Sequence, residues 1–211
     1  MQPINININK ILATIILCSC LSAEIGIVAG LNYGGVTYSE DIFQYMSIAN
    51  GVGASASLEK SIGPTVVGLG FFQQSYVENF SYTGSALSGI SLSFKNTVTT
   101  SYAVGYVVYP YDISKFRFFG GLQFGQLLKG TSRVKLNGLE VTRDIESDEY
   151  KLDVGLLVGV DYMFLKNIGL RGSYYYGLAE ILSEDLDLYI ENEEKLNIMN
   201  VGINAQVLLR F

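Results

Sequence analysis

Few residues in this sequence could carry out catalysis or bind a metal ion. The 211 residues include no histidine, and the two cysteines, Cys18 and Cys20, both lie near the N-terminus. Nucleophilic triads of the Ser-His-Asp kind and histidine-ligated metal sites are therefore excluded. We expect the protein not to be an enzyme, and we expect no metal site and no cofactor.

Charged residues recur on the polar sides of alternating segments. Five of them lie within a few residues of a short turn or of the C-terminal residue, and Asp153 shares the polar face of Asp161. The set is Glu59, Arg117, Asp153, Asp161, Arg171 and Arg210. Because an unpaired buried charge is strongly destabilising, we expect these residues to form an ion-pair cluster that fills the protein interior. A narrow or gated polar path through the protein is the alternative.

The sequence predicts a register for one pair in this set. If the strands on either side of the turn 165–167 pair Phe164 with Ile168, Asp161 lies directly opposite Arg171. The β-carbons of such cross-strand neighbours are about 4.5–5.5 Å apart. That separation permits a bidentate contact between the guanidinium and the carboxylate.

A second group of ionisable residues lies in the segment 180–195. Its seven carboxylates are Glu180, Glu184, Asp185, Asp187, Glu191, Glu193 and Glu194. Oxygen ligands suit Ca²⁺ and Mg²⁺, but the spacing does not match an EF-hand loop. A solvated loop whose charges repel one another is the favoured interpretation.

The elements that must position these residues alternate with a period of two, which predicts β-strands. Eight are expected, at 25–34, 48–59, 65–80, 89–109, 116–130, 149–163, 168–179 and 201–211. We expect the apolar face of each strand to lie outward in lipid and the face with glycine, serine and charged residues to lie inward. The longest alternation places Ile90, Leu92, Phe94, Val98, Tyr102, Val104, Tyr106 and Val108 on one parity.

The connections between these strands alternate in length. The segments 61–64, 111–115 and 165–167 are short, whereas 36–47, 81–88, 131–148 and 180–195 are longer and more polar. Short turns on one side and long loops on the other are typical of outer-membrane barrels. The prediction is an all-β fold, an eight-stranded antiparallel up-and-down transmembrane β-barrel. A soluble exported barrel that binds a small ligand is a weaker alternative, because a water-facing strand surface rarely carries so much glycine.

The N-terminal residues resemble a secretory signal. Lys10 precedes an apolar run of about 13 residues that ends in small residues, too short to span a membrane, which takes roughly 20. We expect a signal peptide at 1–23 and a barrel domain at 24–211. Lipidation at Cys20 is the alternative. The net charge of −6 excludes a nucleic-acid partner.

The loop 131–148 contains a hairpin pattern. Asn137-Gly138 suits a type I′ turn, with Val134 and Leu136 opposite Val141 and Leu139. In this register even residues oppose odd ones, whereas the apolar faces of 116–130 and 149–163 are both even. One β-bulge is therefore expected between the hairpin and the barrel wall.

Three segments resemble the outer-membrane β-barrel domain family of Bacteroidota and related bacteria, which includes small OmpX- and OmpA-type barrels. They are YPYDISKFRFFGGLQFG (109–125), YMFLKNIGLRGSYYYGL (162–178) and VGINAQVLLRF (201–211). The resemblance implies a location in the bacterial outer membrane, among lipid and lipopolysaccharide. It also implies that the barrel-assembly machinery reads Phe211 as the assembly signal.

Two functional classes remain open. One is a structural or surface-interaction protein that acts through its extracellular loops, and we expect it to be a monomer. The other is a small channel or a carrier of small or apolar molecules. Large inward side chains favour the first class, while a continuous lumen lined by glycine and serine would favour the second.

Overall fold

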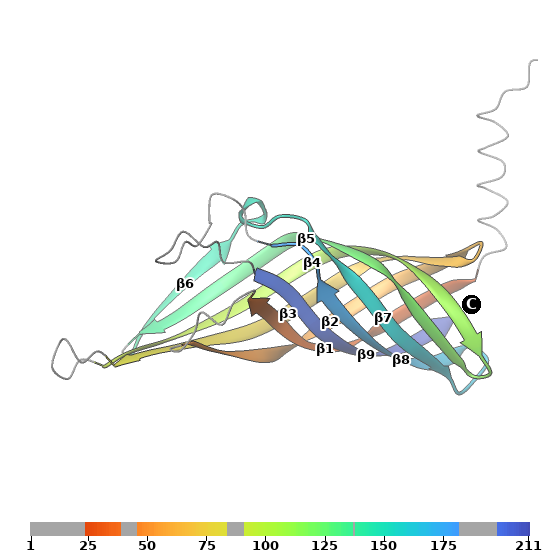
Figure 1. Ribbon diagram of the computed structural model, residues 1–211, viewed down its shortest axis with the longest axis horizontal. Coiled ribbons are helices and arrows are strands. Elements are labelled where there is room, and N and C mark those ends of the chain that lie inside the picture. The colour runs from red at the N-terminus through yellow and green to blue at the C-terminus, as the bar shows by residue number, and fades with distance from the viewer. Residues whose placement is uncertain (1–23, 39–45, 84–90, 137, 182–197) are drawn as a thin grey trace, which may run out of the picture.

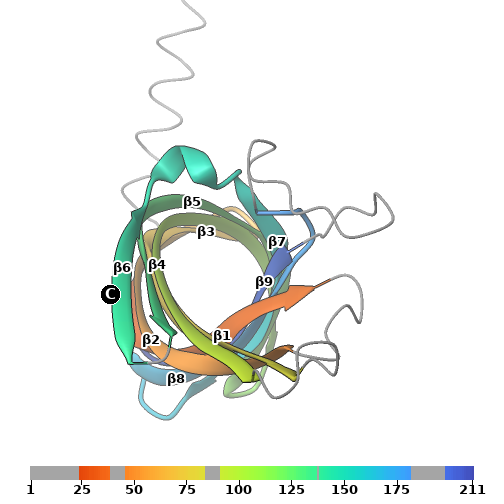
Figure 2. The same ribbon diagram turned by 90° about the vertical axis from the view of Figure 1, so that its left-hand side faces the viewer.

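The protein is a closed antiparallel β-barrel. The computed structural model describes residues 24–38, 46–83, 91–136, 138–181 and 198–211, so the expected signal peptide lies outside the described residues. Within them, eight of nine strands pair in chain order, and β1 pairs with β9 to close the ring. Figure 1 shows the barrel from the side and Figure 2 shows the ring from one end. The predicted up-and-down barrel is confirmed.

The strands that form the ring differ greatly in length. They are β1 (Ile25–Tyr38), β2 (Met46–Ile62), β3 (Thr65–Thr83), β4 (Ser91–Ile113), β5 (Phe116–Leu136), β7 (Asp153–Met163), β8 (Ile168–Gly177) and β9 (Ile198–Arg210). β4 has 23 residues and β5 has 21, whereas about 9–11 tilted residues cross a bilayer. The surplus of β3, β4 and β5 projects beyond one mouth of the ring, on the left of Figure 1. No helix among the described residues is long and apolar enough to cross a membrane.

The ninth strand, β6 (Leu139–Ile145), belongs to this projecting part. It pairs with β5 in the predicted register, with Leu136 opposite Leu139 and Val134 opposite Val141. The short helix η1 (Ser147–Glu149) then leads toward β7. The expected bulge is also present. Ser101 of β4 pairs with Lys129 and Tyr102 pairs with Leu127, so Leu128 is the extra residue of β5.

In β4 the apolar face points to the lumen rather than to lipid, the opposite of the sequence prediction. The apolar parity of β4 faces the lumen, where Val98, Tyr102, Val104, Tyr106 and Val108 are buried. The reason is pairing: Tyr106 lies opposite Gly68 and Tyr102 opposite Phe72, both on the inward face of β3. Directly opposite residues share a face of the sheet. A small barrel also fills its interior with large side chains, so an apolar parity need not face lipid.

The outer surface of the ring is apolar. Leu31, Leu58 and Leu69 keep exposed fractions of 61%, 61% and 69%, and a contiguous exposed apolar surface marks contact with a membrane or a partner. On β5 this band runs from Phe118 to Leu128, both exposed. Ten residue steps cover about 33 Å along a strand, or about 25 Å along the membrane normal at the usual tilt. That height matches the apolar band of an outer-membrane barrel.

Side chains fill the interior of the barrel. One buried apolar cluster lies toward the turn end and comprises Val66, Tyr106, Val108, Phe119, Leu157 and Tyr175. A larger one lies toward the projecting end and comprises Val36, Phe72, Tyr76, Val98, Tyr102, Val104, Leu127, Ile145, Tyr150, Ile181 and Ile198. Tyr150, expected on a lipid-facing parity, belongs to this second cluster because β7 begins only at Asp153. The polar residues of the interior therefore lie in layers beside these two apolar clusters.

Candidate functional site

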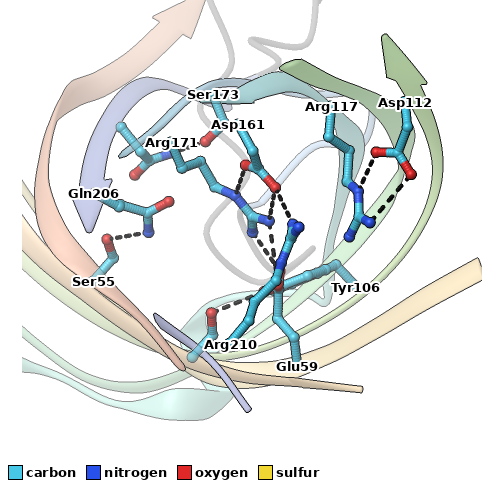
Figure 3. Close-up of polar contacts among 12 residues, drawn as sticks. Ser55, Glu59, Tyr106, Asp112, Arg117, Asp161, Arg171, Ser173, Gln206 and Arg210 are labelled. Carbon is cyan, nitrogen blue, oxygen red and sulfur yellow. Dashed lines mark hydrogen bonds and ion pairs between the residues drawn. The ribbon is translucent and has the colours of Figure 1, made fainter. Parts of the chain in front are cut away.

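Arg171 is the centre of a buried ion-pair network in the lumen. Its Nε donates to Asp161 Oδ1 at 2.6 Å and its Nη2 to Asp161 Oδ2 at 3.0 Å, the bidentate contact expected from the sequence. The same guanidinium also binds Glu59, with Nη2 at 3.2 Å from Oε2 and Nη1 bonded to Oε1. Figure 3 shows this side chain reaching from β8 across the lumen to β2. The Arg171 and Glu59 side chains are each only 5% exposed.

Arg210 and Tyr106 complete this network. Arg210 Nη2 donates to Asp161 Oδ2 at 2.7 Å, and the hydroxyl of Tyr106 donates to Glu59 Oε1 at 2.6 Å. Two carboxylates thus face two guanidinium groups, so the formal charge of the cluster is balanced. We call Glu59, Asp161, Arg171 and Arg210 the lower ion layer. Burial of such charges is tolerable because each has a hydrogen-bonded partner of opposite sign.

Strand register and small neighbours position these side chains. Asp161 of β7 lies opposite Arg171 of β8, the register predicted from the turn between them. Gly68 leaves the space that the ring of Tyr106 occupies, since a β-carbon there would overlap the Tyr106 Cζ. Phe119 packs under the guanidinium of Arg171, with 4.6 Å between Cζ and the ring centroid. Residues from several strands of the barrel wall therefore position the network.

Arg117 lies outside the lower ion layer. Its Nε donates to Asp112 Oδ1 at 2.6 Å and its Nη2 to Oδ2 at 3.2 Å, across the short turn between β4 and β5. Its Nη1 is 3.9 Å from Glu24 Oε2. The Asp112 side chain is 60% exposed and the Arg117 side chain is 18% exposed, so Arg117 pairs at the barrel rim with a carboxylate that reaches water (Figure 3). Asp112 is not among the charged residues expected from the sequence, although its position opposite Arg117 follows from the tight turn between them.

Asp153 lies in a separate layer. Its carboxylate accepts from the hydroxyl of Tyr175 at 2.7 Å and from Nδ2 of Asn200 at 2.8 Å. Gln74 in turn donates through Nε2 to Asn200 Oδ1. We call Gln74, Asp153, Tyr175 and Asn200 the upper polar layer. Among the described residues no lysine or arginine forms an ion pair with Asp153. Of the six charged residues expected to form one cluster, four therefore form the lower ion layer, while Asp153 and Arg117 each lie apart from it.

A small cavity adjoins the lower ion layer. Its volume is about 30 Å³, which is room for about two water molecules. Arg171, Ser55, Ser173, Asn204 and Gln206 are among its lining residues. Gln206 donates to Ser55 at 2.9 Å and Asn204 to Ser173 at 3.2 Å. The polar groups that line this cavity are therefore held in place by hydrogen bonds to one another.

The remaining sequence-derived candidates lie at the two ends of the barrel. Phe211 is 71% exposed, and its backbone exchanges two hydrogen bonds with Ile25 at 2.9 and 3.1 Å. Exposed aromatic side chains of the nearby turns include Tyr111, Phe116 and Phe164. Of the acidic segment 180–195, Glu180 is described and lies 3.7 Å from Lys151, while 182–195 lies outside the described residues. Within the described part of the chain, no three acidic, histidine or cysteine side chains are grouped as a metal site.

A closed barrel with an apolar exterior and an ion-paired interior defines a membrane-spanning β-barrel protein. The model of the outer membrane protein beta-barrel domain family matches residues 16–183. The chain belongs to that family, and its place is the bacterial outer membrane. The lipid of that membrane is therefore its surroundings.

Solved structures with the same fold share little sequence with this chain. The attachment invasion locus protein Ail of Yersinia pestis superposes with a TM-score of 0.50 and 14% identity, over 90% of this chain and 99% of Ail. For Neisserial surface protein A the values are 0.46 and 15%, over 89% and 97%. For the E. coli outer membrane protein W they are 0.45 and 13%, over 90% and 98%. Comparison with curated proteins gave no match. Identities this low show the fold alone.

Proposed function

We propose that this protein is a closed barrel with a structural or surface-interaction role. That role is exerted through the part of the sheet that projects beyond the membrane, and it is not enzymatic. The observation that carries the proposal is the lower ion layer, in which Arg171 of β8 joins Glu59 of β2 across the lumen. A lumen crossed by paired, buried charges leaves no path for a solute.

The alternative of a small channel or carrier requires open space in the interior. The cavity that adjoins the lower ion layer has a volume of about 30 Å³. Buried Phe72, Tyr102 and Leu127 of the larger apolar cluster lie between that level and the projecting end. Passage would therefore require both apolar packing and ion pairs to be broken, which opposes transport by this barrel.

The projecting sheet supplies the proposed contact surface. Leu139 and Val141 of β6 are 73% and 66% exposed, and within the described residues β6 pairs with β5 alone. Exposed apolar residues above a membrane commonly mark sites of protein contact. We propose that this ribbon meets ligands, host surfaces or neighbouring proteins.

Planar-bilayer conductance tests the closed lumen. Folded protein should give no stepwise current, while an established porin in the same bilayer gives clear steps. Reproducible channel openings by the folded protein would contradict the proposal. Replacing residues 134–141 with a tight turn tests the proposed contact surface. Cells that display this variant should contain as much folded barrel as cells that display the wild type, but they should bind less to a ligand or host surface. Unchanged binding would reject the ribbon as the contact surface.

We also propose that residues 1–23 are removed on export and that the barrel-assembly machinery recognises Phe211. The exposed Phe211 side chain supports this, since it adds little packing to the fold. Phe211→Ala keeps both backbone hydrogen bonds with Ile25, so it should lower the amount of assembled barrel in cells without changing the stability of purified folded protein. Normal outer-membrane levels of this variant would oppose the recognition role. We expect the barrel to be a monomer, which sedimentation in detergent would test.

A further inference from the structure

A stripe of basic side chains lies on the outer face of the projecting sheet. On the odd-numbered face of β4 and β5 it comprises Lys95, Lys129, Arg133 and Lys135, which we call the outer stripe. Pairing places Lys95 opposite Lys135 and Thr97 opposite Arg133. All four cations are exposed to solvent, and the Arg133 and Lys135 side chains are each 56% exposed.

The outer stripe begins where the apolar band ends. Phe124 below the bulge and Leu128 in it both face outward, and so does Lys129 directly after it, because the extra residue Leu128 shifts the parity. Arg133 lies four residues further along β5, about 13 Å along the strand and about 10 Å higher above the hydrocarbon at the usual tilt. The stripe thus begins at the level of lipid headgroups and continues above it, on the same side of the sheet as the lipid-facing wall.

Charge is unevenly distributed over this surface. The outward residues of β3 next to the stripe are uncharged (Gln73, Ser75, Val77 and Asn79), and those of β4 and β5 between its cations are Thr97, Thr99, Ser101 and Thr131. The carboxylates on this face lie on the edge strand β6, at Glu140 and Asp144. The stripe therefore keeps an excess of positive charge in a chain whose net charge is −6.

Internal pairing neutralises only part of the stripe. Glu140 accepts from Lys135 at 2.9 Å and from Arg133 at 3.2 Å, and the hydrogen bond from Lys135 lowers the pKa of Glu140. Lys95 and Lys129 form no ion pair among the described residues. Two lysines directly opposite each other, as Lys95 and Lys135 are, repel and destabilise the sheet. An external anion would relieve that repulsion.

We propose that the outer stripe binds the phosphate groups of outer-leaflet lipopolysaccharide. The hydroxyl groups between the cations can donate to phosphate or sugar oxygens, and long basic side chains at a membrane boundary reach the headgroups readily. Lipid is the occupant because the stripe continues the lipid-facing wall directly above the hydrocarbon. A soluble polyanion would first have to displace the headgroups that already lie there.

Binding of lipid A tests the proposal. The full chain, folded in neutral detergent, is titrated with phosphorylated lipid A and with its dephosphorylated form. Each cation near an anionic lipid surface contributes roughly fivefold in affinity. The triple variant Lys95→Gln, Lys129→Gln, Arg133→Gln should therefore bind phosphorylated lipid A about 100-fold more weakly than the wild type. The matched control Lys115→Gln, Lys166→Gln, which changes exposed lysines of the opposite turns, should bind as the wild type does.

Three results would overturn the proposal: equal affinity of the triple variant and the wild type, equal affinity for both forms of lipid A, or an equal loss in the control variant. A water-soluble phosphorylated oligosaccharide without acyl chains provides a further arm. If it binds the wild type as tightly as lipid A, the stripe serves a soluble polyanion and the lipid assignment falls. If the triple variant does not fold, Lys129→Gln alone should give a roughly fivefold loss, and no loss would reject the proposal.

Discussion

The lower ion layer and the upper polar layer solve the same problem in different ways. Each holds at least one carboxylate inside a barrel whose wall is surrounded by lipid. In the lower layer Asp161 is 0% exposed and lies between two guanidinium groups, those of Arg171 and Arg210. In the upper layer Asp153 is 4% exposed and is held by the neutral donors Tyr175 and Asn200.

The difference shows how each layer depends on its members. A balanced ion cluster is sensitive to the loss of any partner, because the charge that remains is buried and unpaired. Removal of a carboxylate that is held by neutral groups leaves no buried charge unpaired. The lower layer should therefore be much the more sensitive of the two to substitutions that remove charge.

The largest effect is expected for Arg171→Ala. It removes the only guanidinium that binds Glu59 among the described residues and half of the charge facing Asp161. The free energy of unfolding should fall by about 3–5 kcal/mol, measured by urea titration in lipid vesicles. Arg171→Lys, which restores charge but not the bidentate contact, should recover part of the loss. A loss below about 1 kcal/mol for the alanine variant would remove the contrast between the layers.

A double-mutant cycle sharpens the same point. Asp161→Ala and Arg171→Ala should couple by about 1–3 kcal/mol, because these residues share two hydrogen bonds. Asp153→Ala and Arg171→Ala provide the control, since they share no partner within the described residues and should be nearly additive. Coupling of equal size in both cycles would mean that the two layers act as one unit.

A smaller effect is expected for Asp153→Asn in the upper layer. The amide keeps the size of the carboxylate, and the Tyr175 hydroxyl can accept where it previously donated. The free energy of unfolding should change by about 1 kcal/mol or less, whereas Asp161→Asn in the lower layer should lose several times more. The comparison uses one substitution type in two layers of one barrel. A similar loss in both variants would show that pairing with arginine does not distinguish them.

The smallest effect is expected at the rim. Arg117→Ala breaks a pair in which the Asp112 side chain is 60% exposed and the Arg117 side chain is 18% exposed, and ion pairs with a water-exposed partner contribute about 0–1 kcal/mol. Added salt should weaken the wild-type contact further. Urea titration of this variant beside Arg171→Ala would show whether burial, rather than the arginine–carboxylate contact itself, sets the cost. Equal losses at both sites would overturn that explanation.

The sequence predicted the projecting ribbon well because its determinants are local. Asn137-Gly138 between matched apolar residues predicted the register of β5 and β6, and the parity conflict with the wall predicted a bulge. The partners Asp161 and Arg171 were predicted for the same reason, since only four residues separate the ends of their strands. Each of these features involves neighbours along the chain.

Partners distant in the chain were decided by the closed barrel. Nothing local relates Glu59 to Arg171 or Asp153 to Asn200, and these pairs meet only because the ring brings β2 toward β8 and β7 toward β9 around one lumen. The inward parity of β4 has the same origin. Alternation alone determined that one face of 89–109 is apolar, but either lipid or a packed interior can accept such a face. Pairing with the inward glycine and phenylalanine of β3 decided it. The sequence thus determined the strands, the turns and the membrane-spanning barrel, because these follow from period and turn chemistry. The tertiary structure alone decided which charges that lie far apart in the chain meet.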